Sequence, residues 1–339
     1  MLILNEDQQL LQESAQQLVD AEAPIGRFRS LRDQGLRQDA ALWKQLTELG
    51  FPGIPFSEED GGMGWGLPEV AVVMEELGRT LALHPMVSVL LGGLLDPEAG
   101  AATGKVVALA WQEGESLDRS LVKVRVTEGR LHGRKLHVLD AGAADSFVVT
   151  ARDGDALALF RVAASEARVQ PLVRADHRDA GHVHFESSKA IRLDAGGAEL
   201  EASIEQGTVA LAAEMLGGAQ AAMASTVDYL KERVQFDVPI GSFQVLQHRV
   251  VDMYMAVELC RAAVVAAARD PRPELVSLAK ASANDTYMLV AKEAIQLHGG
   301  IGMTDEHDIG FHLKRALVAS RTLGSSAWHR DRWARVAGY

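Results

Sequence analysis

The sequence predicts an α+β protein in three consecutive parts: a helical N-terminal domain, a middle β domain and a C-terminal four-helix bundle. Apolar residues recur at the three-to-four spacing of an amphipathic helix before residue 100 and again after residue 200. Between them lie short β-branched or alternating runs, bounded by turn-forming residues. No strand-then-long-helix alternation accompanies these runs, so a small β-barrel or sandwich is favoured over a doubly wound nucleotide fold.

The predicted elements follow this order. In residues 1–100 one apolar helix face is formed by Leu10, Leu11, Ala15, Leu18 and Val19, and a glycine-rich loop at residues 61–66 precedes another helix. In residues 101–200 strand-like runs lie at 106–109, 121–126, 146–149 and 183–185, with a spacing that predicts antiparallel pairing. In residues 201–339 the helical period predicts four long helices, at 205–233, 243–269, 273–298 and 308–336.

Composition narrows the class of protein. The chain has 339 residues, of which 47% are hydrophobic, enough for a large core. A net charge of -12 without a basic block argues against binding through the phosphate backbone of nucleic acid. The single cysteine, Cys260, fits a reducing, cytoplasmic compartment, and no stretch approaches the roughly 20 apolar residues needed to span a membrane.

Two segments of the C-terminal part carry the most specific pattern. Residues 233–248, reading RVQFDVPIGSFQVLQH, form a cationic helix end, a tight turn and a new helix. Residues 296–303, reading QLHGGIGM, offer a glutamine and closely spaced glycines that let a backbone approach a bulky ligand. Taken singly, the first is also typical of a helix C-cap and the second of an ordinary interhelical turn.

Taken together, in this order and at this spacing, the two segments resemble the signature of the acyl-CoA dehydrogenase family. That signature typically reads Arg-x-x-Phe-Gly, then Phe-Gln, then Gln-x-x-Gly-Gly-x-Gly. The stretch Glu75-Glu76-Leu77-Gly78 and the loop at residues 61–64 support the resemblance, which spans almost the whole chain and is weakest between about 92 and 200. One departure is Asp237, where the family usually has glycine.

The resemblance implies FAD as cofactor, bound between the β domain and the C-terminal helices, with part of the site supplied by a neighbouring subunit. Arg233 and Phe236 match positions that contact the adenosine diphosphate half of FAD, where a guanidinium suits a pyrophosphate. The other matching cofactor residues are Gln244, Gln296, Gly299 and Gly300, and residues 110–113 loosely match the flavin-facing strand and loop.

The resemblance also implies the reaction, which removes the α-proton of an acyl-CoA with a carboxylate while the β-hydrogen leaves as hydride to the flavin. The usual position of that carboxylate is occupied by Leu323, and the alternative position on an earlier helix by Gly207. Glu214, two helical turns after Gly207, is the remaining candidate for the base. An alternative interpretation of Glu214 is a structural glutamate paired with an arginine or facing a subunit contact.

The expected function is therefore FAD-dependent α,β-dehydrogenation of an acyl-CoA, with electrons passed to an acceptor such as an electron-transfer flavoprotein, in a homo- or hetero-oligomer, a dimer or tetramer. The missing carboxylates leave open a second function, that of a non-catalytic or half-site subunit of a heteromeric enzyme. An oxidase that uses oxygen is a third. A metal site is not expected, because His307 and His312 point about 140° apart on a helix.

Overall fold

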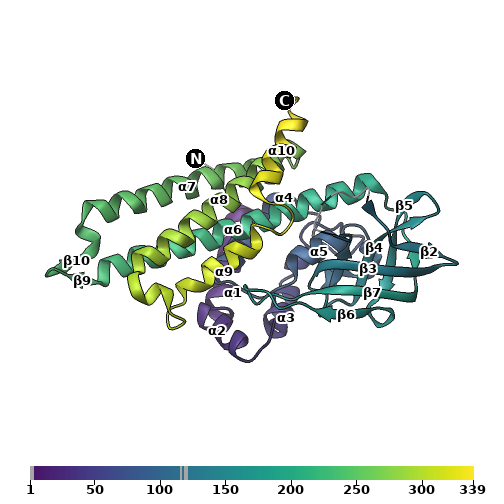
Figure 1. Ribbon diagram of the computed structural model, residues 1–339, viewed down its shortest axis with the longest axis horizontal. Helices are drawn as coiled ribbons and strands as arrows, with labels where there is room; N and C mark the ends of the chain where they lie inside the picture. The colour runs from purple at the N-terminus through teal and green to yellow at the C-terminus, as the bar shows by residue number, and fades with distance from the viewer. Residues whose placement is uncertain (1–3, 115–116, 118–120) are drawn as a thin grey trace. The chain divides into compact units, whose positions relative to one another are not determined.

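The computed structural model describes residues 4–114, 117 and 121–339 (Figure 1). By its internal contacts the chain forms two compact units that do not follow the order of the sequence. Unit 1 consists of Met1–Gln34, Leu67–Ala82 and Thr208–Tyr339, and unit 2 consists of Gly35–Gly66 and Leu83–Gly207. Along the chain, the elements come in the predicted order of helical, β and helical parts, so the predicted fold class is confirmed.

Unit 1 is helical. Its helices are α1 (Glu6–Glu22), α2 (Ile25–Asp33), α4 (Leu67–Arg79), the part of α6 (Gly197–Glu232) that begins at Thr208, α7 (Gln244–Arg269), α8 (Pro273–His298), α9 (Ile309–Ala319) and α10 (Ser326–Val336). Local signals set several helix starts: Asn5 and Gln8 form a reciprocal capping box on α1, and the Ser325 hydroxyl accepts from the Trp328 N–H at the start of α10. No described helix is both long and apolar enough to cross a membrane.

Helices α4 and α6 cross at two glycines. A Cβ added at Gly78 would lie 2.0 Å from the Glu214 carbonyl oxygen, and one added at Gly217 would lie 1.8 Å from the Glu75 carbonyl oxygen. Both distances are far below van der Waals contact, so any side chain at either position would force the helices apart. The crossing brings the backbone of Glu214 directly against α4.

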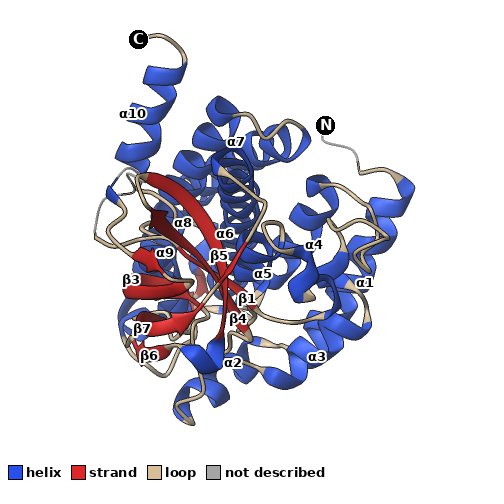
Figure 2. Ribbon diagram, turned by 90° about the vertical axis from the view of Figure 1, so that its right-hand side faces the viewer, coloured by secondary structure: helices blue, strands red, loops and turns tan. Residues whose placement is uncertain are grey.

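Unit 2 holds the β-sheet and the helices α3 (Ala40–Glu48) and α5 (Met86–Gly93) (Figure 2). The strands are β1 (Val107–Ala110), β2 (Arg125–Thr127), β3 (Arg130–Leu139), β4 (Ser146–Asp153), β5 (Ala156–Ala163), β6 (Arg168–Pro171), β7 (Ala180–Lys189) and β8 (Ile191–Arg192). They form one eight-stranded sheet in the order β6-β7-β3-β2-β4-β5-β8, with β1 paired to β4. Its buried side chains, among them Phe147, Val149 and Phe185, form one apolar core.

Two expectations about these elements were wrong in part. Antiparallel pairing holds for most of the sheet, but β1 and β2 both pair with β4 in parallel. The predicted long helix at 308–336 is interrupted between α9 and α10, where Leu323 has φ 57° and Gly324 has φ 116°. A residue in the left-handed region cannot continue a right-handed α-helix, so the chain turns there.

Buried polar groups hold this turn from the side. The Lys280 ammonium on α8 is fully buried and donates to Asn284 Oδ1 at 2.5 Å, Ala319 O at 3.0 Å and Gly324 O at 3.3 Å. Three acceptors match the three N–H groups of a charged lysine. Burial nevertheless penalises the charge and lowers the pKa of Lys280 from 10.5 to about 7. Because the unfolded chain then binds a proton that the folded chain lacks, stability should rise with pH across this window.

We expect Lys280→Met to remove that increase. The free energy of unfolding of the wild type, relative to Lys280→Met, should grow between about pH 7 and pH 10, by at most roughly 5 kcal/mol. Urea unfolding at a series of pH values measures the difference. Lys292→Met, at an exposed position of the same helix, is the matched control and should track the wild type. Parallel curves for the wild type and Lys280→Met would contradict the assignment.

Candidate functional site

The first of the two signature segments forms a hairpin between α6 and α7 (Figure 1). Strands β9 (Val234–Gln235) and β10 (Val238–Pro239) pair antiparallel, and the two residues at the tip, Phe236 and Asp237, have φ of 56° and 64°. Two left-handed residues in a two-residue turn give the hairpin the right-handed twist of its strands. The Phe236 ring is 86% exposed and meets the Phe243 ring edge-on at 6.0 Å.

Arg233 begins the hairpin and Gln244 begins α7. The Ile240 N–H donates to Arg233 O at 2.8 Å, which closes the base of the hairpin. The side chains of Arg233 and Gln244 are both exposed. The hairpin therefore presents a cation, an aromatic ring and an amide on one short stretch of backbone.

The second segment lies at the end of α8. Gln296 is exposed in the last turn, and Gly299 and Gly300 begin the 3-10 helix η7 (Gly299–Met303). Gly299 has φ 63°, and a Cβ added at either glycine would meet nothing within 4 Å. The Tyr229 ring of α6 stacks on the His298 ring of α8 at 4.5 Å, so the two segments lie at the same end of these helices.

All six predicted cofactor residues belong to unit 1, and all six are exposed in the single chain. An exposed guanidinium, an exposed ring and two open glycines fit the pyrophosphate and adenosine of FAD, because charge, stacking surface and close backbone approach are what these groups require. The residues therefore fit the cofactor chemically. A bound dinucleotide is ordinarily well covered, so these six residues alone would leave it more exposed than is usual.

The loosely matched segment 110–113 lies in unit 2 and is fixed by a buried lysine. Lys135 Nζ donates to Glu113 Oε1 at 2.6 Å, Thr150 Oγ1 at 2.8 Å and Trp111 O at 3.2 Å. The Glu113 carboxylate also accepts from the N–H groups of Lys123 and Val124. Burial lowers the pKa of Lys135 to about 8 although the Glu113 charge opposes this shift. A cavity of about 160 Å³ adjoins Trp111 and Glu113.

The residue at the family's usual base position, Leu323, is buried on the turn between α9 and α10. Its carbonyl oxygen lies 3.0 Å from His329 Nε2, and the Gly324 carbonyl accepts from Lys280 and Asn284. Burial lowers the pKa of His329 to about 3, so the ring is neutral and donates through Nε2. These hydrogen bonds fix the backbone of the turn, but the side chain of Leu323 is apolar.

The alternative base position, Gly207, is a packing position in unit 2. A Cβ added there would lie 2.4 Å from Leu91 Cδ2 of α5. A glutamate at residue 207 would therefore displace Leu91. The glycine is explained by close packing alone.

Glu214 lies in a buried ion pair. Its side chain is 3% exposed, and Oε1 accepts from Arg315 Nη1 of α9 at 3.0 Å. Arg315 Nη2 also donates to the Leu81 carbonyl at 3.1 Å. This is the arginine pair that the sequence left open as the alternative for Glu214. The sequence did not identify Arg315 as the partner, because the two residues are 101 positions apart and neither carries a local signal of the other.

Comparison with known proteins decides the family. The profile of the N-terminal domain of acyl-CoA dehydrogenases matches residues 5–96, and that of the C-terminal domain matches residues 195–338. The chain belongs to the acyl-CoA dehydrogenase family. It is accordingly a flavoprotein whose cofactor is FAD and an oxidoreductase that acts on CH–CH bonds of acyl-CoA thioesters. The predicted family, enzyme class and cofactor are thus confirmed.

Individual relatives cover nearly the whole chain. The acyl-CoA dehydrogenase IpdE2 of Mycobacterium tuberculosis is 33% identical over 326 residues, 94% of each chain. A solved ChsE4-ChsE5 complex from Mycobacterium tuberculosis is 26% identical, with a TM-score of 0.90 and 99% of each chain covered. The Tcur3481-Tcur3483 steroid ACAD is 28% identical, with a TM-score of 0.87 and 98% of each chain covered.

The Glu214–Arg315 pair makes a prediction about stability. Arg315→Met should lower the free energy of unfolding by roughly 3 kcal/mol, because it leaves a buried carboxylate without its cation. Arg335→Met, which breaks the exposed Arg335–Asp331 pair of α10, is the matched control and should cost less than about 1 kcal/mol. Equal effects of the two substitutions in urea unfolding would show that the buried pair is not a major stabilising contact.

Proposed function

We propose that this acyl-CoA dehydrogenase chain works as one subunit of a heteromeric enzyme and that a partner chain supplies the catalytic carboxylate. One observation carries the proposal: the turn that bears the base elsewhere in the family presents Leu323, and a leucine cannot accept a proton. Tight packing accounts for Gly207, and Arg315 engages Glu214. The chain's similarity to the ChsE4-ChsE5 complex, which contains two differently named chains, is consistent with such an assembly.

In this proposal the chain's own residues bind the cofactor across the subunit contact. Arg233 pairs with the pyrophosphate, Phe236 packs against the adenosine half, and Gln244 hydrogen-bonds the flavin. The backbone at Gly299 and Gly300 approaches the adenosine, beside the Gln296 amide. FAD, when bound, accepts the hydride that leaves the β-carbon of the acyl group.

The surface around the hairpin supports a protein partner. Large apolar side chains are exposed on the hairpin and along α7: Phe236 (86%), Val245 (68%), Val251 (52%), Tyr254 (54%), Met255 (50%) and Leu259 (74%). Exposed apolar side chains gathered on one region are typical of protein interfaces. We therefore propose that this region contacts the partner chain, in a dimer or a larger oligomer.

The substrate class and the electron acceptor belong to the same proposal. The steroid ACAD among the similar structures makes acyl-CoA thioesters with bulky, ring-containing acyl groups the first substrates to test, beside straight chains. We propose an electron-transfer flavoprotein as the acceptor of the electrons from the reduced cofactor.

A second candidate function is a self-sufficient dehydrogenase in which Glu214 is the base. The position of Glu214 favours it: this buried carboxylate lies on α6, two helical turns after Gly207, the family's alternative base position. Its pair with Arg315 argues against it, because a carboxylate held by an arginine is not free to reach a substrate. The two candidate functions differ in whether the isolated chain can dehydrogenate an acyl-CoA.

We expect the chain purified alone to be weakly coloured or inert. Co-expression with each acyl-CoA dehydrogenase chain of the same organism that retains the C-terminal glutamate should yield a yellow complex with one of them. A thioester titration without oxygen should then bleach its flavin absorbance near 450 nm. Bleaching of the isolated chain, with turnover in the presence of an electron acceptor, would refute the partner requirement and favour the second candidate.

Glu214→Gln separates the two candidates by a different measurement. The substitution keeps the shape of the side chain and removes its negative charge. With a partner-supplied base, turnover of the active complex should stay within about threefold of wild type, because Glu214 then has only a structural role. If Glu214 is the base, turnover should fall by at least about a thousandfold while FAD remains bound. The visible spectrum of the purified variant checks cofactor retention, and its urea midpoint checks folding.

A further inference from the structure

Three aromatic rings connect the two segments that carry the proposed cofactor residues. Tyr229 of α6 stacks on His298 of α8, with centroids 4.5 Å apart and planes at 26°. His307, in the loop before α9, lies 4.5 Å from His298 and 6.4 Å from Tyr229 between ring centroids. The rings thus form one cluster, here called the aromatic stack, with a member from each of three chain segments.

Two rings of the stack are close in sequence to proposed cofactor residues, and one of them is also connected by a backbone hydrogen bond. Arg233 follows Tyr229 by one helical turn, and its N–H donates to Tyr229 O at 2.9 Å. His298 stands between Gln296 and Gly299, and its buried ring anchors the end of α8. A shift of either ring would therefore move the backbone that carries a proposed cofactor residue.

The surroundings of His298 favour its neutral form. Its Nδ1 lies 2.7 Å from the Ala294 carbonyl oxygen, which requires a proton on Nδ1. Its Nε2 is buried and has no hydrogen-bond partner among the residues that the structure describes. A second proton would place a charged N–H there without an acceptor. Burial, and the nearby His307, lower the pKa of His298, although its bond to Ala294 opposes this.

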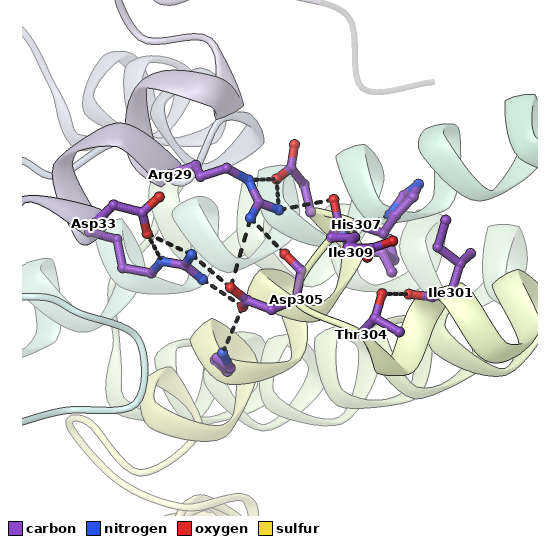
Figure 3. Close-up of polar contacts among 11 residues, drawn as sticks. Arg29, Asp33, Ile301, Thr304, Asp305, His307 and Ile309 are labelled. Carbon is purple, nitrogen blue, oxygen red and sulfur yellow. Dashed lines mark hydrogen bonds and ion pairs between the residues drawn. The ribbon is translucent and has the colours of Figure 1, made fainter.

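The loop that carries His307 is held by two arginines of α2 (Figure 3). Arg29 donates to Asp308 Oδ1 at 2.8 and 2.6 Å and to the Asp305 carbonyl at 2.6 Å. Arg32 donates to both carboxylate oxygens of Asp305, at 2.6 and 2.8 Å. Within the loop, the Ile309 N–H donates to His307 Nδ1 at 3.1 Å. The third ring of the stack thus has a fixed position of its own.

We propose that Tyr229, His298 and His307 are positioning residues of the cofactor site, which hold the Arg233 hairpin and the Gly299–Gly300 backbone in the relative position that FAD requires, and which release it on acidification. The inference rests on the proposed role of Arg233, Gln296 and the two glycines in binding FAD. None of the three rings needs to touch the cofactor. Their contribution is to preorganise two segments that are distant in sequence.

The acid sensitivity follows from the same geometry. Protonation of His298 adds a buried N–H without an acceptor, and the resulting charge lies in a ring packed against His307, with centroids 4.5 Å apart. The charged groups that line the cavities beside His307 are Asp20 of α1, Arg79 of α4, Asp228 and Glu232 of α6, and Glu306 and Asp308 of its own loop. His312 of α9, also beside this cavity, remains neutral because burial lowers its pKa to about 3.

The test is the dissociation constant of FAD, measured by flavin fluorescence between pH 5 and pH 8 on the flavin-binding form of the protein, the chain alone or with its partner. At pH 8, Tyr229→Ala and His298→Ala should each weaken FAD binding about tenfold or more, because each removes a ring contact. Tyr229→Phe should bind as wild type, since it keeps the ring. His298→Phe keeps the ring but cannot be protonated, so it should retain FAD at acidic pH where the wild type loses it.

Arg233→Ala is the reference variant, because it tests the cofactor site itself. Weaker binding by Arg233→Ala, with unchanged binding by Tyr229→Ala and His298→Ala, would overturn the positioning role and leave the proposed site intact. If His298→Phe loses FAD at acidic pH as the wild type does, the proposed release of FAD on acidification is overturned. Equal FAD binding by the wild type and Arg233→Ala would refute the cofactor site and the inference together. His307→Ala, at a half-buried position, carries the test if a variant at Tyr229 or His298 does not fold.

Discussion

The helical unit depends on the close approach of α4 to α6 at Gly78 and Gly217, where an added Cβ would lie 2.0 and 1.8 Å from the opposing carbonyl oxygens. Helices this close leave no room for side chains between them. The polar side chains near the crossing therefore form their hydrogen bonds and ion pairs with groups at its edges. The Glu75 carboxylate of α4 accepts from Gln220 of α6 at 2.8 Å and from Arg261 of α7 at 2.6 Å. Glu214, whose carbonyl faces Gly78, sends its side chain to Arg315 of α9. The Glu75–Gly78 stretch, noticed first as a family resemblance, thus has a packing role that joins α4 to α6 and α7, and Glu214 extends the connection to α9.

The same packing explains why the chain offers no evident base. Each of the three positions at which the family pattern or the helical period would place one has a structural function here. Leu323 is on a turn whose carbonyls accept hydrogen bonds from His329, Lys280 and Asn284. A side chain at Gly207 would have to displace Leu91, and Glu214 forms an ion pair with a buried arginine. A carboxylate introduced at residue 323 or residue 207 would have to meet these constraints first.

Sequence reasoning predicted the elements whose signals are local and missed the contacts that join distant segments. The tight turn within residues 233–248 and the boundaries of α7 and α8 follow from proline, glycine and helical spacing within a few residues. The two short strands of the hairpin and its tip at Phe236–Asp237 were not predicted. The break before α10 was missed although Gly324 and the Ser325 cap are local signals, because the helical spacing continues on both sides of it. The bonds that hold this turn could not be predicted, since Lys280 lies 44 residues from Gly324 in the sequence. For the same reason neither the Arg315 partner of Glu214 nor the parallel pairing of β1 with β4 could be predicted. The six predicted cofactor residues come from the family resemblance, and only the structure could show that they are exposed.

That exposure has a consequence for how the flavin is retained. A cofactor that binds to residues lying open on one chain gains most of its burial only when a second chain closes over it. Binding and association are then linked by mass action, so each strengthens the other by the same free energy. Bound FAD would then stabilise the contact between subunits. Dilution would dissociate the subunits and with them the cofactor, without any change in the chain itself. The flavin content of a preparation would then report its state of assembly as directly as its mass.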